Sequence, residues 1–285
     1  GVTTRLRYAP STRFFLDDRA RGRPWLTPLP FPVQVLQKVE TIDHISGNKH
    51  VSTYRYHHGY YDGRERAFMG FGRVDQFDSE TFADFARPDL HGDDSPFGNA
   101  SPAHHMPPVE TRTWYHTGVY FDSLGARRVD YRDLAQRFRQ EFYALDTLAP
   151  PLPPHMVETG DAPAEAYRAL RGAPLRSEIY AHDGSERAVH PYQVSETRHR
   201  VKQLQPRGGN AHAVFLVDQA EGLSYSYERN PADPRITHTL TLALDAYGNP
   251  LRTLSIGYGR RQADADLPSP ADREQQTKTH ITYGE

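Results

Sequence analysis

THTLTLALDAYGNPLRTLSIGYGRR, residues 237–261, carries the clearest secondary-structure signal in the chain. Apolar and small polar residues alternate up to residue 244, and the alternation resumes after the turn DAYGN at 245–249. The alternating apolar residues are Leu240, Leu242, Leu244, Leu254, Ile256 and Tyr258. A period of two on both sides of a turn that contains Asp, Gly and Asn is typical of an antiparallel β-hairpin. The stretch therefore predicts a mainly β fold.

Two further regions follow the same pattern. Residues 213–217 (AVFLV) and 223–229 (LSYSYER) are predicted as two strands, separated by a short loop that contains Gly222. Near the start of the chain, residues 33–56 are predicted to form another hairpin, with its turn at 46–48. These segments make the antiparallel hairpin the repeating unit of the predicted fold.

The predicted turns share a composition in which Asp or Asn occurs beside Gly. The turn residues are Gly47, Asn48, Asp62, Gly63, Asp183, Gly184, Asp245, Gly248 and Asn249. An Asp side chain can hold a turn through hydrogen bonds to the backbone, while Gly supplies a positive φ angle. Because a positive φ is costly for a β-branched residue, we expect both Gly63→Val and Gly248→Val to impair folding.

The run YRYHHGYYDGRERAFMGFGRVDQF, residues 54–77, is the part of the chain that most resembles a reaction centre. It contains His57 and His58, but adjacent residues of a strand point to opposite faces and cannot easily share one metal ion. A glycosidase pair of carboxylates needs a defined separation and one raised pKa, and the sequence shows neither. The carboxylates are Asp62, Glu65, Asp75 and Asp78, which we expect to cap turns and to form exposed ion pairs with Arg64, Arg66 and Arg73. We interpret the run as a hairpin.

Common catalytic motifs are absent from the sequence, including G-x-S-x-G, H-E-x-x-H, the Walker A loop and paired C-x-x-C. Ser46 begins a formal S-x-x-K match, but it lies in a predicted turn and not on a helix. The motifs GFGRV, from Gly70, and GYGRR, from Gly257, lack the third glycine of a dinucleotide loop. They fit strands with bulges or with close backbone approach better.

A loop at residues 91–105 contains Asp93-Asp94 and His104-His105, which could in principle bind a metal ion. The sequence identifies no residue that would orient these side chains as ligands, and loops rich in His, Asp and Pro are mostly solvated. We therefore predict no catalytic, cofactor-binding or metal-binding residue, no cofactor and no enzyme activity.

The composition limits the classes of function. Among 285 residues, Lys and Arg number 34 and Asp and Glu 36, so the net charge is −2. This balance argues against a nucleic-acid surface, which needs a basic excess to displace counterions from phosphate. The chain has no Cys, and no apolar run approaches the roughly 18 residues of a membrane helix. The 17 Tyr and 13 Phe favour a folded β-rich chain whose sheet surface is largely solvated.

One helix is predicted, at residues 131–145 (YRDLAQRFRQEFYAL), where the apolar residues form one helical stripe. The stripe consists of Leu134, Phe138, Phe142 and Leu145. Four regions follow from these predictions: a β-hairpin segment, an irregular loop, a strand–helix–proline-rich connector, and a second β-hairpin segment. Their bounds are 1–82, 83–108, 109–160 and 161–285. Because the chain begins with Gly1 and shows no signal segment, we expect it to be a region of a longer protein.

Several long stretches resemble the middle-to-C-terminal region of the B component of insecticidal Tc toxin complexes. They include LPFPVQVLQKVETIDHISGNKHVSTYRYHHGYYDGRERAFMGFGRVDQFD at 29–78, PYQVSETRHRVKQLQP at 191–206 and YERNPADPRITHTLTLALDAYGNPLRTLSIGYGRR at 227–261. The resemblance covers nearly the whole chain, and is least characteristic at residues 82–106 and around Pro150. It implies part of a curved, hollow β-shell wall related to Rhs and YD-repeat proteins.

In that family the B component joins a C component and encloses the cytotoxic C-terminal part of C, and an A component forms the injection channel. The resemblance therefore implies a secreted structural segment whose partners are the C component and its enclosed segment. Contact with the A component would use other parts of the longer chain, and neither nucleic acid binding nor direct membrane insertion is expected.

Two other functions stay open from the residues alone. An extracellular carbohydrate- or receptor-binding β-module would use exposed Tyr side chains and Trp114, lined along a groove. A hydrolase would use the carboxylates of residues 62–78 or Ser46, and would require these groups to converge in a pocket.

Overall fold

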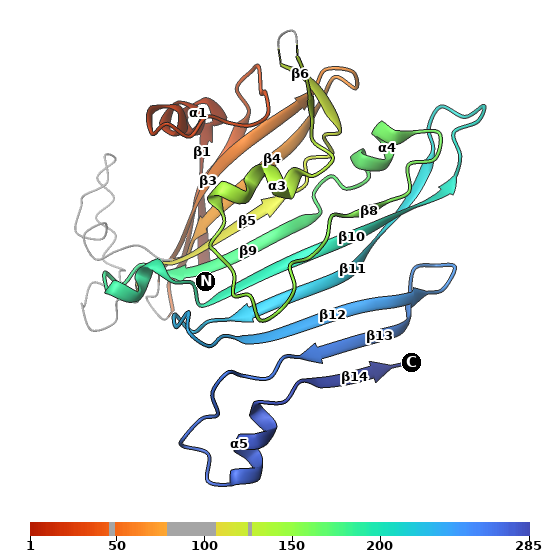
Figure 1. Ribbon diagram of the computed structural model, residues 1–285. Helices are drawn as coiled ribbons and strands as arrows, with labels where there is room; N and C mark the ends of the chain where they lie inside the picture. Colours follow the sequence, from red (N-terminus) through yellow and green to blue (C-terminus); the bar gives the residue numbers. More distant parts are fainter. Residues whose placement is uncertain (46–48, 79–106, 125–126) are drawn as a thin grey trace.

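The structure is a computed structural model that describes residues 1–45, 49–78, 107–124 and 127–285. Nearly all of its strands belong to one antiparallel sheet, which Figure 1 shows as a single twisted, curved layer. The sheet contains, in spatial order, β1 (Val2–Pro10), β2 (Gln34–Asp43), β3 (Lys49–Asp62), β4 (Ala67–Phe77), β5 (Val109–Tyr115), β9 (Pro174–Ala181), β10 (Gln193–Gln205), β11 (Val214–Ser226), β12 (Arg235–Leu244), β13 (Pro250–Gly257) and β14 (His280–Gly284). The predicted mainly β, antiparallel fold is confirmed.

Two small strand elements lie outside this order. The strand β8 (Met156–Val157) pairs in parallel with β10, and β6 (Phe121–Leu124) and β7 (Arg127–Asp130) form a separate hairpin. In Figure 1 this hairpin lies in front of the main sheet, on the same side as the helices α3 (Leu134–Phe138) and α4 (Pro163–Arg168). The sheet therefore has one partly covered face and one bare face.

The hairpin predicted at residues 237–261 is present as β12 and β13, with Leu240 opposite Leu254. Its turn is held by the Asp245 carboxylate, which accepts hydrogen bonds from the backbone N–H groups of Tyr247 (2.8 Å) and Asn249 (2.9 Å). Gly248 has a φ of +90°. The chain turns here because the Asp side chain bonds to the backbone two and four residues later, and because Gly248 adopts a left-handed conformation.

The predicted turn at residues 62–66 differs in where the positive φ lies. The Asp62 carboxylate accepts hydrogen bonds from the N–H groups of Arg64 (2.9 Å) and Glu65 (3.3 Å). The left-handed residue is Arg66, at +53°, and Gly63 is not left-handed. The positive φ expected at Gly63 is therefore absent, and nothing lies within 4 Å of a Cβ added there, so the reason for expecting Gly63→Val to be costly does not hold.

This difference gives a paired prediction for the two turns. Gly248→Val should lower the free energy of unfolding by about 1–2 kcal/mol, because a β-branched residue is strained at positive φ. Gly63→Val should leave it close to the wild-type value and serves as the matched control. Urea unfolding followed by circular dichroism measures both. Equal losses in the two variants would contradict the assignment of strain to Gly248.

The other predicted turn residues fall in two groups. The Asp183 carboxylate accepts a hydrogen bond from Ser185 N (3.0 Å), and Gly184 has a φ of +72°. A 3-10 helix, η3 (Glu186–Val189), follows this turn before β10 begins. Gly47 and Asn48 lie outside the described residues, as do Ser46 and residues 79–106, which contain His91, Asp93-Asp94 and His104-His105.

The two strands predicted at 213–217 and 223–229 are one continuous strand, β11. Arg198 of β10 pairs with Glu221 and His199 pairs with Gln219, so Ala220 is an extra residue that forms a bulge. The chain passes through Gly222 without a loop because the bulge absorbs the irregularity within the strand.

The predicted helix at 131–145 is shorter than its apolar stripe. The Asp133 carboxylate accepts the N–H of Gln136 (3.0 Å) and begins α3, and a 3-10 turn, η2 (Arg139–Glu141), ends the helix. Phe142 already has an extended backbone. Three further α-helices in the described part of the chain were not predicted: α1 (Ser11–Ala20), α4 and α5 (Pro270–Gln276). None of the helices in the described ranges is long and apolar enough to cross a membrane.

Residues 142–155 form an extended, proline-rich segment that we call the strap. In Figure 1 it runs in front of β10 and β11. Several of its side chains pack on a cluster of buried residues centred on Leu223, Tyr225 and Ile236. A second cluster, around Trp114 and Phe138, lies between α3 and the sheet. The main cores of the chain thus lie between the sheet and its cover, by which we mean α3, η2, the strap and α4. The division of the chain at residues 82, 108 and 160 stays a prediction.

Candidate functional site

His57 lies between two carboxylates and connects α1 to the sheet. Its Nδ1 is 2.6 Å from Asp18 Oδ2, and its Nε2 is 3.1 Å from Asp75 Oδ2. Both ring nitrogens therefore act as donors, and the ring is the cation between two anions. Burial lowers the pKa of His57, but the hydrogen bonds that the ring donates to Asp18 and Asp75 outweigh it and raise that pKa. Such a ring holds a helix in place and has no free nitrogen for catalysis or metal binding.

His58 faces a different carboxylate. Its backbone is left-handed, with φ of +56°, its Nδ1 accepts the N–H of Leu26 (3.1 Å), and its Nε2 donates to Glu141 Oε1 (2.7 Å). Glu141 also accepts hydrogen bonds from Arg73 (3.1 Å) and from Trp114 Nε1 (3.0 Å). Burial raises the pKa of Glu141, but these partners outweigh it and lower that pKa to about 2. The prediction that the two side chains point to opposite faces was wrong: the ring centroids of His57 and His58 are 6.4 Å apart, because the left-handed backbone of His58 interrupts the alternation of the strand. Each ring is bonded to a different carboxylate.

The carboxylates of residues 62–78 are separated and individually bonded. Asp75 forms a two-point ion pair with Arg73, at 2.6 and 2.8 Å, and both side chains are buried. The prediction of exposed ion pairs was therefore wrong for this pair. The pKa of Asp75, which burial alone would raise, is lowered to about 2 by the hydrogen bond from His57 and by the Arg73 charge.

The pairs predicted with Arg64 and Arg66 are replaced by longer-range contacts. Glu65 accepts a hydrogen bond from Arg168 of α4 (2.7 Å), which also approaches Asp62 (3.8 Å). Asp78 accepts a hydrogen bond from Ser52 (3.2 Å). Asp62 and Glu65 thus face one guanidinium, while Asp75 and Asp78 are bonded to other partners. These contacts give no support to the carboxylate form of the hydrolase alternative.

An ionic row crosses the covered face of the sheet from strand to strand. Register places Arg73 of β4 beside Trp114 of β5, Trp114 beside Arg176 of β9, and Arg176 beside Glu196 of β10. The Arg73 guanidinium lies 5.0 Å from the Trp114 ring centroid, and that of Arg176 lies 4.6 Å from the ring of Phe142. Cations therefore alternate with aromatic rings and anions under the cover.

Arg176 of this row donates from all three of its guanidinium nitrogens. It donates to Glu178 (2.6 Å), to Glu196 (2.7 Å) and to the carbonyl oxygen of Tyr143 in the strap (2.6 Å). Glu178, whose side chain is 0% exposed, accepts in turn from Tyr143 N (2.9 Å) and Tyr180 Oη (2.7 Å). The arginine thus joins two strands and the strap through buried, charge-assisted hydrogen bonds.

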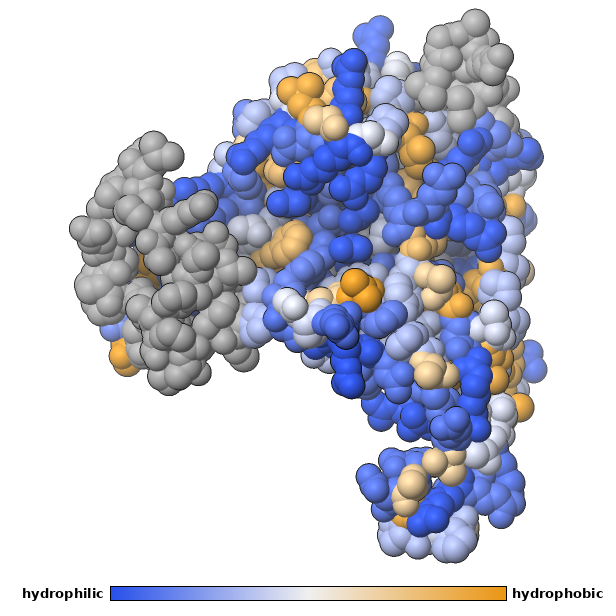
Figure 2. Space-filling model, turned by 60° about the vertical axis from the view of Figure 1, so that its left-hand side comes forward, coloured by the Kyte–Doolittle hydropathy of each residue, from blue (hydrophilic) through white to orange (hydrophobic). Residues whose placement is uncertain are grey.

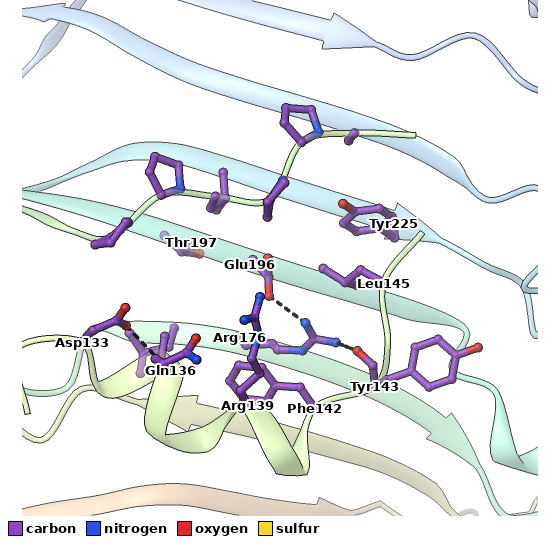
Figure 3. A pocket seen from close by; sticks show the side chains of 18 of the residues that line it. Asp133, Gln136, Arg139, Phe142, Tyr143, Leu145, Arg176, Glu196, Thr197 and Tyr225 are labelled. Atoms are coloured by element: carbon purple, nitrogen blue, oxygen red, sulfur yellow. Dashed lines mark hydrogen bonds and ion pairs between the residues drawn. The ribbon is translucent and has the colours of Figure 1, made fainter. Parts of the chain in front are cut away.

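A pocket of about 590 Å³ lies between α3, the strap and strands β9 to β11. Figure 3 shows Arg176 and Glu196 on its floor, joined to each other, with Arg176 also bonded to Tyr143. The prolines of the strap and the side chains of Leu145, Leu152 and Tyr225 supply much of the remaining lining. Within the described ranges, no group of three His, Asp or Glu residues is arranged to hold a metal ion.

The ionic row was missed from the sequence, although a signal for it exists. Opposite charges two residues apart recur inside strands, and four such pairs are bonded: Lys38 with Glu40, Arg73 with Asp75, Glu110 with Arg112, and Arg176 with Glu178. Glu196 and Arg198 have the same spacing in β10 but pair with Arg176 and Glu221 instead. Residues i and i+2 of a strand share a face, so this spacing marks one face of the sheet. Trp114, proposed as an exposed ligand-binding ring, is 0% exposed, which removes a main motive for the carbohydrate- or receptor-binding alternative.

Comparisons with known proteins point to one family. The model of the insecticide toxin TcdB middle/N-terminal region matches residues 1–86, and that of the TcdB middle/C-terminal region matches residues 165–285. A crystal structure of TcdB2-TccC3-Cdc42 is 33% identical over 95% of this chain, with a TM-score of 0.74. No significant match was found among curated proteins.

Two further solved structures are similar over most of this chain. A crystal structure of TcdB2-TccC3 without the hypervariable C-terminal region is 31% identical over 99% of it, with a TM-score of 0.76. A Tc holotoxin pore from Photorhabdus luminescens is 33% identical over 95% of it, with a TM-score of 0.73. The matches cover 12% of the chain in TcdB2-TccC3-Cdc42 and in the holotoxin pore, and 13% in the truncated complex.

Proposed function

The chain belongs to the TcdB middle-region family of insecticide toxins, and from this premise we propose that it is a wall segment of the B component of a Tc toxin complex. In that role it helps to form a hollow shell that encloses the cytotoxic C-terminal part of the C component before translocation. It acts by containment and not by bond chemistry. The observation that carries this proposal is the single curved sheet. Charged side chains on its covered face form ion pairs that join neighbouring strands.

The architecture suits a container wall in two further ways. The outer strands β1 and β14 each have one partner in the main sheet, so their other edges can pair with neighbouring strands of a longer wall. The face shown in Figure 2 is mainly hydrophilic, with apolar residues in small scattered patches. A surface of this kind does not adsorb an enclosed, incompletely folded polypeptide.

The partners in this proposal are the C component and its enclosed segment. The similar solved structures include complexes of TcdB2 with TccC3, and one is a Tc holotoxin pore. We propose that the A component contacts other parts of the longer chain, and that the complex is secreted. Neither nucleic acid binding nor direct insertion into a membrane is part of this role.

Single cysteines test containment, because the natural chain has none. Thr239→Cys places a thiol on the bare face of β12, and Gln140→Cys places one on the cover; both positions are exposed. In the longer B protein bound to its C partner, we expect one thiol to react with a small maleimide but not with a bulky polyethylene-glycol maleimide. The other thiol should react with both reagents.

The same two variants without the C partner and without the rest of the B protein provide the control. Both thiols should then react with both reagents, because no shell is closed around either face. If the bulky reagent modifies both positions at equal rates in the B–C complex, the segment is not part of a closed wall.

A further inference from the structure

Three histidines meet where the strap ends on the sheet. His116 follows β5, His155 is the last residue of the strap, and His199 lies in β10. The ring centroids of His155 and His199 are 5.5 Å apart, and those of His116 and His155 are 6.0 Å apart. His116 and His199 are buried, at 1% and 7% exposed. The end of the strap is therefore packed into a row of imidazole rings.

Hydrogen bonds fix the rings of His116 and His155 in neutral form. His155 Nδ1 accepts the backbone N–H of His199 (3.1 Å), and His116 Nδ1 accepts that of Gly118 (2.9 Å). The proton of each neutral ring therefore sits on Nε2, and neither Nε2 has a hydrogen-bond partner among the described residues. His199 uses Nε2 to donate to the carbonyl oxygen of Pro174 (2.8 Å). A second proton on His155 would have to occupy Nδ1, where it would destroy the bond to His199.

The positive charge of Arg198 also opposes a second proton on His155. On β10, Arg198 donates to the carbonyl oxygen of Pro154 (2.8 Å) and forms an ion pair with Glu221. On α4, the Tyr167 ring lies 6.3 Å from that of His116. Other charged residues line the same pocket as His155; the cations are Arg132, Arg139 and Arg176, and the anions are Asp133, Asp146 and Glu196. Burial, followed by the charges of His199 and Arg198, lowers the pKa of His155 to about 4.

The other end of the strap is anchored by a different contact. Asp146 forms a two-point ion pair with Arg261 (2.6 and 2.7 Å) and accepts the N–H of Leu148 (2.7 Å). The hydrogen bond from Arg261 lowers the pKa of Asp146, so this carboxylate stays ionised in mild acid. The strap is therefore held at one end by an ion pair of Asp146 and at the other by a neutral imidazole of His155.

We propose that His155 is an acid-sensitive latch, which holds the C-terminal end of the strap on β10 and releases it when the medium is acidified. The strap then swings from Asp146 and opens the side of the pocket that Pro154 and His155 close. The parallel pairing of Met156 and Val157 with β10 is the contact that would loosen next.

The direction of the pH effect follows from the lowered pKa. The contribution of neutral His155 is complete above pH 6.5, and it is lost as the pH falls from there toward about 4. With 6.5 for the released ring and about 4 for the bound ring, the equilibrium constant for release rises about 30-fold between about pH 7.5 and pH 5.

Amide hydrogen exchange of the full chain tests this latch at the His199 N–H. After correction for the intrinsic effect of pH, its exchange should be about 30-fold faster at about pH 5 than at about pH 7.5, while amides of β12 and β13 keep their protection. His155→Asn should remove most of this response, because Asn Oδ1 replaces Nδ1 as acceptor and cannot be protonated in this range. His212→Asn is the matched control, since the His212 side chain is 70% exposed, and it should respond as the wild type does.

Three results would overturn the latch. The corrected exchange of the His199 amide in the wild type could be equal at both pH values, a result that does not depend on whether any variant folds. His155→Asn could keep the full response. Alternatively, β12 and β13 could lose protection together with the strap, which would mean acid unfolding of the whole sheet.

Discussion

Replacing Arg176 with methionine is expected to lower the free energy of unfolding by about 3–5 kcal/mol. The substitution keeps most of the apolar length of the side chain but leaves Glu178, whose side chain is 0% exposed, without its cation. It also leaves the carbonyl oxygen of Tyr143 without the donor that ties the strap to β9. A buried carboxylate that loses its partner is far more costly than an exposed one, because water cannot replace the lost charge.

The double variant Arg176→Met with Glu178→Gln separates the charge from the packing. The glutamine still offers an acceptor to Tyr143 N but carries no charge, so the double variant should be more stable than Arg176→Met alone. Arg235→Met is the surface control, because Arg235 and Glu228 are paired with side chains 63% and 62% exposed. Urea unfolding followed by circular dichroism measures all three. If Arg176→Met behaves like Arg235→Met, the ionic row does not hold the cover to the sheet.

Hairpins whose alternation uses apolar residues could be predicted from the sequence. The residues of 237–261 pair in the predicted register and carry a turn whose chemistry is local, so pattern and structure agree on the hairpin. Its alternating apolar side chains are only half-buried, and Leu242 is exposed. The turn at 62–66 shows the limit of this reasoning. The composition of the turn identified Asp62 as the capping residue. The residue with a positive φ is Arg66 and not Gly63, because the path of the following strand decides which residue is left-handed.

The covered face of β9 could not be read in the same way, because its buried residues are charged. In PLRSEIYA, at 174–181, Arg176, Glu178 and Tyr180 are buried, while Ser177 and Ile179 on the other face are half-buried. An argument from periodicity places charged side chains on the solvent-exposed face of a strand. Charged side chains can lie on the buried face only when partners distant in sequence neutralise each charge. Those partners, Tyr143 and Glu196, come from the strap and from β10.

The prediction of the helix length was wrong for a related reason. Leu134 and Phe138 pack in the cluster around Trp114, and Phe142 packs at its edge, but Leu145 contacts the other cluster, under the strap. One helix could not reach both clusters, so the chain becomes extended at Phe142 and crosses from the first to the second. Tertiary packing overrides a helical stripe when its members belong to different cores.

Trp114 gives the second large effect expected in this chain. The side chain is 0% exposed, packs edge-on against Phe142 at 5.0 Å between ring centroids, and donates from Nε1 to Glu141 (3.0 Å). Trp114→Ala should therefore lower the free energy of unfolding by about 3–5 kcal/mol, through lost apolar contact and the cavity left behind. Circular dichroism in urea measures this loss.

Trp114→Phe distinguishes packing from the hydrogen bond. It keeps a ring for Arg73 and Phe142 but removes the donor to Glu141, which His58 and Arg73 still bond, so we expect a loss of about 1 kcal/mol. A loss as large as that of Trp114→Ala would assign the effect to the Glu141 bond and not to the ring. If instead both variants are as stable as the wild type, the contact with Trp114 of β5 is not needed to hold η2 on the sheet. The cover would then be free to leave the sheet, and the buried row beneath it would be open to water.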